Sequence, residues 1–153
     1  MRETTFVALL LPLRLFVGWV FLRASIVKLA DGWFDQPKLA PIILGWLHDG
    51  KSYGFFTPFL HDVVLPNAQQ FGRAVTAGEL LVGGALLAGF FTRVAALGGL
   101  LLSLSFMLAR GDGIDANQTA PFVAMTLTLL FTHSGRALGV DAALADRVPS
   151  WLT

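Results

Sequence analysis

The sequence predicts an all-α membrane protein in which four transmembrane helices form a bundle and a long, partly helical interfacial loop follows the first of them. Of the 153 residues, 55% are hydrophobic and only 14% are charged, whereas soluble domains carry about 25% charged residues. Four apolar segments follow one another along the chain, and a helix needs about 20 such residues to cross a bilayer. The length suits a single membrane domain over residues 1–153.

The first apolar segment, residues 6–30, carries the basic residues Arg14, Arg23 and Lys28. Its apolar pattern continues past Arg14, and no small-residue cleavage site follows a short apolar core, so the pattern favours a retained span over a signal peptide. Lys28 lies near the end of the span, and we expect its long side chain to reach the membrane surface.

The connection over residues 31–66 is unusually apolar for a loop and contains four prolines. It includes Trp33, Trp46 and Tyr53 together with the run LAPIILGWL. Aromatic side chains of this kind lie at the level of the lipid headgroups, so we predict one or two short helices in the membrane interface. A segment of this length can also cover a cavity between the spans.

The second and third spans, residues 67–91 and 94–110, are separated by almost no chain and therefore form an antiparallel hairpin. Small residues four apart, such as Ala74 and Gly78, allow membrane helices to approach closely. The fourth span covers residues 117–133, and residues 140–153 form an amphipathic tail that Trp151 anchors at the surface.

Orientation follows from the basic residues in the short segments. With both termini on one side of the membrane, that side holds more of them than the other, which favours cytoplasmic termini. We therefore expect a multi-pass protein of the cytoplasmic membrane, with its long aromatic loop outside. The basic residues of the cytoplasmic side are Arg2, Arg93, Arg136 and Arg147.

Glu79 is the only charge in the 19 residues between Arg73 and Arg93. A charged side chain at this depth costs several kcal/mol unless it is paired, neutralised or in contact with water. Comparing the depths of the charged residues along the two spans predicts that Glu79 pairs with Arg23. Arg14 is the second choice. Two interpretations stay open: a structural ion pair, or a binding or proton-handling site.

A cavity on the loop side of the bundle is the expected site. Its catalytic residues are predicted to be Glu79 and Arg23, and its substrate-binding residues are Arg14, Arg23, Glu79, Asn117 and Trp46. Polar groups gather in this half of the membrane, and aromatic residues of the loop lie above them.

Several chemistries are disfavoured by the composition. The chain has no cysteine, which excludes disulfides, thiol catalysis and iron–sulfur ligation. The three histidines lie in loops or at the far end of a span, so neither haem nor a metal is predicted, and no dinucleotide or flavin fingerprint occurs. A net charge of +1 without a basic run gives no reason to expect nucleic acid as a partner.

Three segments of the chain are distinctive: LPLRLFVGWVFLRASIVKL, VTAGELLVGGALLAGFFTRVAALGG and SGRALGVDAAL. They resemble the DoxX-like family of small four-helix membrane proteins. The long first loop ending in LPNAQQF resembles the DoxD branch, the small subunit of thiosulfate:quinone oxidoreductase.

This resemblance implies a membrane subunit of a quinone-linked oxidoreductase that acts on a small sulfur compound such as thiosulfate. The implied cofactor is a quinone. The implied partners are the lipid bilayer, a second membrane-associated subunit and further copies of the chain. The alternative function is a non-catalytic scaffold, or a bundle that binds lipid or a small anion and supports a partner protein.

Overall fold

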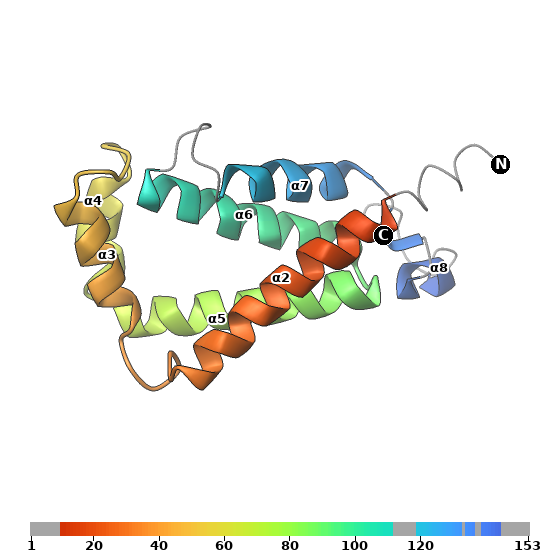
Figure 1. Cartoon of the computed structure of the whole chain (residues 1–153), viewed down its shortest axis with the longest axis horizontal. Helices are drawn as coiled ribbons and strands as arrows, with labels where there is room; N and C mark the ends of the chain where they lie inside the picture. Colours follow the sequence, from red (N-terminus) through yellow and green to blue (C-terminus); the bar gives the residue numbers. More distant parts are fainter. Residues whose placement is uncertain (1–9, 112–118, 133, 137–138, 145–153) are drawn as a thin grey trace.

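The computed structural model describes residues 10–111, 119–132, 134–136 and 139–144, and over these residues the chain is helical without a strand. Four helices make up the body of the molecule: α2 (Leu11–Ala30), α5 (Ala68–Ala88), α6 (Thr92–Arg110) and α7 (Ala120–Phe131). Helix α2 packs along α5, α6 packs along α7, and the contact between α5 and α6 joins the two pairs. The all-helical prediction is confirmed for the described residues (Figure 1).

Helices α2 and α5 cross at two glycines, and their backbones touch there. A Cβ atom on Gly83 would lie 2.5 Å from the backbone nitrogen of Leu22 and 2.9 Å from the carbonyl oxygen of Gly18. Only glycine allows so close an approach, as the small residues of the sequence predict. Next to this crossing lies the main apolar core, made up of Val17, Phe21, Val82, Leu86, Ala95, Ala96 and Leu129.

The hairpin between α5 and α6 is confirmed, and its turn has two residues in the left-handed region. Gly89 ends α5 with a φ of 63°, and Phe91 precedes α6 with a φ of 44°. Glycine adopts this conformation readily, whereas it is rare for a bulky residue such as phenylalanine. The turn therefore needs support from another part of the chain.

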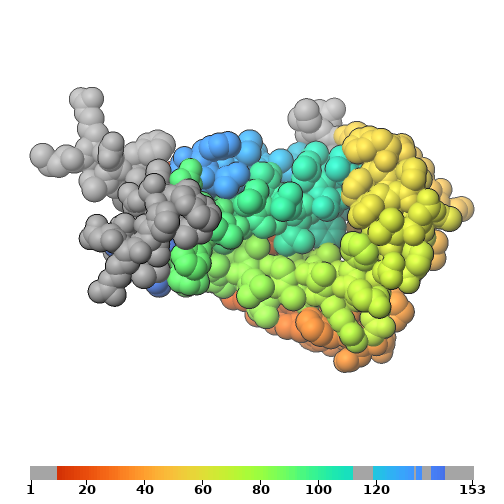
Figure 2. Space-filling model, turned by 180° about the vertical axis from the view of Figure 1, so that it is seen from behind, coloured from red at the N-terminus to blue at the C-terminus, as the bar shows by residue number. Residues whose placement is uncertain are grey.

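The long connection is partly helical, as predicted. It contains α3 (Leu39–His48), the short helix α4 (Thr57–Phe59) and the π-helical turn η1 (Leu60–Val64). These elements lie across one end of the bundle, against the ends of α5 and α6 (Figures 1 and 2). A second apolar core holds them there, formed by Trp33, Leu39, Ile43, Leu60, Val64, Ala68 and Ala109.

Two described helices, α5 with 21 residues and α6 with 19, are long and apolar enough to cross a membrane. Helix α2 has 20 residues but carries three basic side chains, and α7 has only 12 residues. Four spans were expected, and length and composition support two of them. Residues 6–9, 117, 118 and 133 of the expected spans lie outside the described residues.

The C-terminal part of the chain contributes two short elements. The 3-10 turn η2 (Ser134–Arg136) and helix α8 (Val140–Leu144) pack against each other at the end of the bundle opposite α3 and α4 (Figure 1). The expected amphipathic tail began at residue 140, where α8 begins, and its residues 145–153 lie outside the described part of the chain.

Candidate functional site

Glu79 is buried near the middle of α5 and forms an ion pair with Lys28 at the end of α2. Only 4% of its surface is exposed, and the Lys28 ammonium lies 2.5 Å from both of its carboxylate oxygens. The prediction that Glu79 pairs with Arg23 or Arg14 is therefore wrong. The expectation that Lys28 reaches to the membrane surface is also wrong, because its side chain is only 16% exposed.

The helical positions explain why Lys28 is the partner. Arg14, Gly18, Phe21 and Ser25 are buried along one face of α2, and Lys28 continues their alternating spacing of four and three residues. The sequence contained this signal. The depth estimate missed it because it aligned the centres of the two spans, whereas the contact between Leu22 and Gly83 shifts α2 along α5 and brings Lys28 to about the level of Glu79.

Arg23 lies on the opposite side of α2. It is two residues from both Phe21 and Ser25, which places it about 200° around the helix from the buried face. The side chain is exposed and makes no hydrogen bond or ion pair with the described residues. The structure thus separates Arg23 from Glu79, with which the sequence analysis had grouped it.

Arg14 is buried at the other end of the bundle, far along α2 from Lys28. Its Nη1 donates a hydrogen bond of 2.7 Å to the carbonyl oxygen of Ser134, and it interacts electrostatically with Asp141. The Asp141 carboxylate in turn accepts hydrogen bonds from the backbone N–H groups of Phe91 (2.7 Å) and Thr92 (2.9 Å). Arg14 therefore belongs to a buried polar cluster that fastens α8 to the α5–α6 turn.

Sequence reasoning missed the role of Asp141, which it placed in an amphipathic tail. The carboxylate is fully buried and caps the N-terminus of α6, where N–H groups lack partners within the helix. The left-handed Phe91 immediately before α6 is held by the same carboxylate. A single buried aspartate 49 residues along the chain leaves no local pattern by which to find it.

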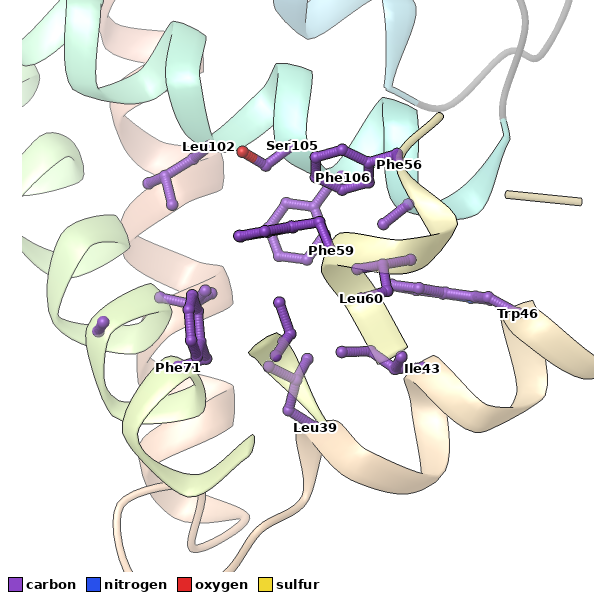
Figure 3. A pocket seen from close by; sticks show the side chains of 14 residues that line it. Leu39, Ile43, Trp46, Phe56, Phe59, Leu60, Phe71, Leu102, Ser105 and Phe106 are labelled. Atoms are coloured by element: carbon purple, nitrogen blue, oxygen red, sulfur yellow. The ribbon is translucent and has the colours of Figure 1, made fainter. Parts of the chain in front are cut away.

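A pocket of about 270 Å³ lies between α5, α6 and the elements of the long connection (Figure 3). Of the residues predicted for the site, Trp46 lines this pocket, and Ser105 supplies a hydroxyl group at its edge. Aromatic rings make up much of its wall, because the connection brings its phenylalanines against α5 and α6. The aromatic residues around the pocket are Trp46, Phe56, Phe59, Phe71 and Phe106.

Phe106 connects this pocket to the ion pair. Its ring lines the pocket, and the ring centroid lies 5.5 Å from the Lys28 ammonium. The Trp33 ring centroid lies 5.3 Å from the same ammonium, so two aromatic rings and the Glu79 carboxylate surround it. Contacts of this type favour a cation at this position. The Phe106 ring thus belongs both to the wall of the pocket and to the surroundings of the ion pair.

The remaining candidates contribute less. Asn117 lies outside the described residues. Within the described part of the chain, no group of three or more histidine, aspartate or glutamate side chains could hold a metal ion. His61 contacts Asp62 at 2.8 Å, but both side chains are exposed.

The family comparison covers the ion pair and most of the surrounding helices. The sequence profile of the DoxX family matches residues 9–109, which includes Arg14, Lys28, Glu79 and Phe106, whereas Asp141 lies beyond the match. No solved structure matches the chain. Because the matched region makes up well over half of the sequence, the protein belongs to the DoxX family of membrane proteins.

Proposed function

We propose that this DoxX family protein is the membrane subunit of a quinone-linked oxidoreductase that acts on a small sulfur compound such as thiosulfate. The observation that carries the proposal is the aromatic pocket with the Lys28–Glu79 pair next to its wall. The sulfur compound comes from the resemblance of the long first loop to the DoxD branch.

The size and lining of the pocket suit a quinone ring. Ligand sites are mostly apolar with a few polar groups that set orientation, and here Ser105 is the polar side chain among aromatic and aliphatic neighbours. A cavity of about 150 Å³ accommodates benzene, so about 270 Å³ leaves room for ring substituents. Stacking on Phe59, Phe71 or Phe106 would hold a flat ring.

Lys28 and Glu79 are the charged groups next to the pocket wall, and they can exchange a proton. A quinone that accepts two electrons also takes up two protons to become a quinol. A carboxylate and an ammonium in hydrogen-bond contact can pass a proton between them, and few other groups at this depth can do so, because Glu79 is the only acidic residue in α2, α5, α6 and α7. Rotation of the Phe106 side chain would open the pair to the pocket.

The test is thiosulfate-dependent reduction of a short-chain quinone analogue by the purified protein in liposomes. Replacing Glu79 alone leaves Lys28 without its partner, so the informative variant is Lys28→Met with Glu79→Gln, which removes both charges. We expect its rate to fall roughly 100-fold, the lower end for the loss of an acid–base group. Unchanged activity in a folded double variant would remove the pair from the mechanism.

Occupancy of the pocket is tested separately by binding. Ala74→Phe places a ring in the pocket, whereas Leu81→Phe places the same ring on the exposed outer face of the same helix. We expect the thermal stabilisation of the protein by the quinone analogue to be lost in the first variant and kept in the second. Equal stabilisation of both variants would place the ligand elsewhere.

The second candidate function is a scaffold that binds lipid and supports a partner protein without catalysis. One observation favours it: apart from Ser105, the side chains around the pocket are apolar, so an acyl chain would fill it as well as a ring. In that case a fatty acid stabilises the wild-type protein as much as the quinone analogue does, and thiosulfate has no effect on the redox state of the quinone.

A further inference from the structure

Arg23 is a charged side chain on the outer, apolar face of α2. Its neighbours on this face are Trp19, Ile26 and Val27, each with 50% or more of its surface exposed. Such residues face lipid in a membrane protein. An arginine among them costs several kcal/mol unless a counter-charge or water meets it, and no described side chain provides a counter-charge.

The crossing of α2 and α5 gives the depth of Arg23. The backbone of the preceding residue, Leu22, touches Gly83, and α5 ends five residues later at Ala88. At 1.5 Å per residue, the Arg23 backbone therefore lies about 8 Å inside the end of α5. This is the end where α2 begins and where α8 packs (Figure 1).

The Arg23 side chain is oriented so that its guanidinium can extend out of the hydrocarbon layer. Side chains on a helix lean toward its N-terminus, and the N-terminus of α2 lies at the same end of the bundle as the C-terminus of α5 (Figure 1). A long arginine side chain can extend its guanidinium toward the headgroups while its methylene groups stay in lipid. Trp19 lies one turn closer to that end on the same face, at the level where indole rings gather.

We propose that Arg23 and Trp19 form a binding site for the phosphate of an anionic phospholipid in the leaflet on the side of the chain termini. Guanidinium binds phosphate through two parallel hydrogen bonds, and the indole ring lies beside the glycerol region. This site is separate from the aromatic pocket and does not depend on the proposed oxidoreductase activity.

The four long helices of a second copy do not provide the counter-charge. The only acidic residue in α2, α5, α6 and α7 is Glu79, which is buried and already bound to Lys28. A two-fold contact centred on Arg23 would bring two guanidinium groups together. Lipid phosphate is present at the required depth all around the protein, and it has the required charge.

The experiment measures phosphatidylglycerol bound to the protein in phosphatidylcholine nanodiscs, by native mass spectrometry and by thermal stabilisation. We expect Arg23→Gln to lower the apparent affinity about fivefold, which corresponds to the roughly 1 kcal/mol contributed by one basic residue near an anionic surface. Arg23→Lys should keep most of the effect. Lys51→Gln is the matched control, because Lys51 is an exposed cation at the opposite end of the bundle.

Two outcomes would overturn the proposal. The first is equal phosphatidylglycerol binding by the wild type and Arg23→Gln. The second is a contact between copies through this face. It would appear as a disulfide-linked dimer of Ile26→Cys in membranes, and the assay is clean because the chain has no cysteine.

Discussion

At the scale of single residues, the central feature of the site is the Lys28–Glu79 ion pair. The pair is buried near the middle of α5, so each charge depends on the other. Breaking a buried pair leaves an uncompensated charge and costs about 3–5 kcal/mol, whereas removing both charges costs much less. This asymmetry can be measured.

We expect Glu79→Gln and Lys28→Met each to lower the free energy of unfolding in detergent by about 3–5 kcal/mol. The double variant should recover part of that loss, giving a coupling energy well above the about 0.5 kcal/mol seen for independent sites. Arg23→Gln with Glu79→Gln is the control cycle, and its effects should add. Coupling in the control cycle instead would contradict the pairing seen in the structure.

Residue patterns predicted part of this site. Burial of Glu79 followed from its isolation in an apolar run, and the aromatic cover over a loop-side cavity followed from the composition of residues 31–66. The partner of Glu79 did not follow, because depth along each helix taken separately does not give the register in which the two helices pack, which the contact between Leu22 and Gly83 sets. The buried stripe of α2, ending at Lys28, would have given the answer if it had been weighed above depth.

At the scale of elements, the crossing of α2 and α5 depends on Gly83. A methyl group there would collide with backbone atoms of Leu22 rather than with a flexible side chain. We expect Gly83→Ala to destabilise the protein by about 1–3 kcal/mol, the usual range for overpacking. Gly84→Ala is the matched control, since nothing lies within 4 Å of its Cβ position, and thermal unfolding of the two variants compares them directly.

Helix α8 is held at the end of the bundle by the contacts of Asp141. Asp141→Asn keeps the shape of the side chain but removes the charge that meets Arg14 and the N-terminus of α6. One carboxylate oxygen becomes an NH2 donor, so one of the two hydrogen bonds from the start of α6 is lost, which costs about 1–3 kcal/mol, and a buried arginine without its counter-charge costs more. We expect a lower melting temperature and faster proteolysis after α7, and a melting temperature equal to wild type would show that the cluster contributes no stability.

At the scale of the whole molecule, the hairpin, the bundle and the helical connection followed from apolar segment lengths and small residues. The helical cover over the bundle end also followed, from the composition of residues 31–66, whereas the shortness of α7 and the contacts that fix α3, α4 and η1 in place did not. Packing between segments distant in the sequence sets these features, as Gly111 shows: a Cβ there would overlap the Lys51 carbonyl oxygen. No local pattern predicts a contact of that kind.

The expected topology is tested by labelling single introduced cysteines in sealed vesicles. Asp49→Cys and Arg93→Cys lie at opposite ends of the bundle and should react from opposite sides of the membrane. We expect label at position 49 from outside and at position 93 from the cytoplasm. Leu81 and Leu101 are exposed on the surfaces of α5 and α6, and cysteines there should stay unlabelled if lipid covers them. Reaction at these two positions would contradict a transmembrane bundle.

The capping of α6 by Asp141 also has a consequence for the order of events during synthesis. When Thr92 leaves the ribosome, the carboxylate that will hold its N–H group is still 49 residues away. The α5–α6 turn, with its left-handed Phe91, therefore enters the membrane without its cap. It becomes fixed only after α7 and α8 have been made and α8 has folded back, so closure of this end of the bundle has to wait for the synthesis of Asp141.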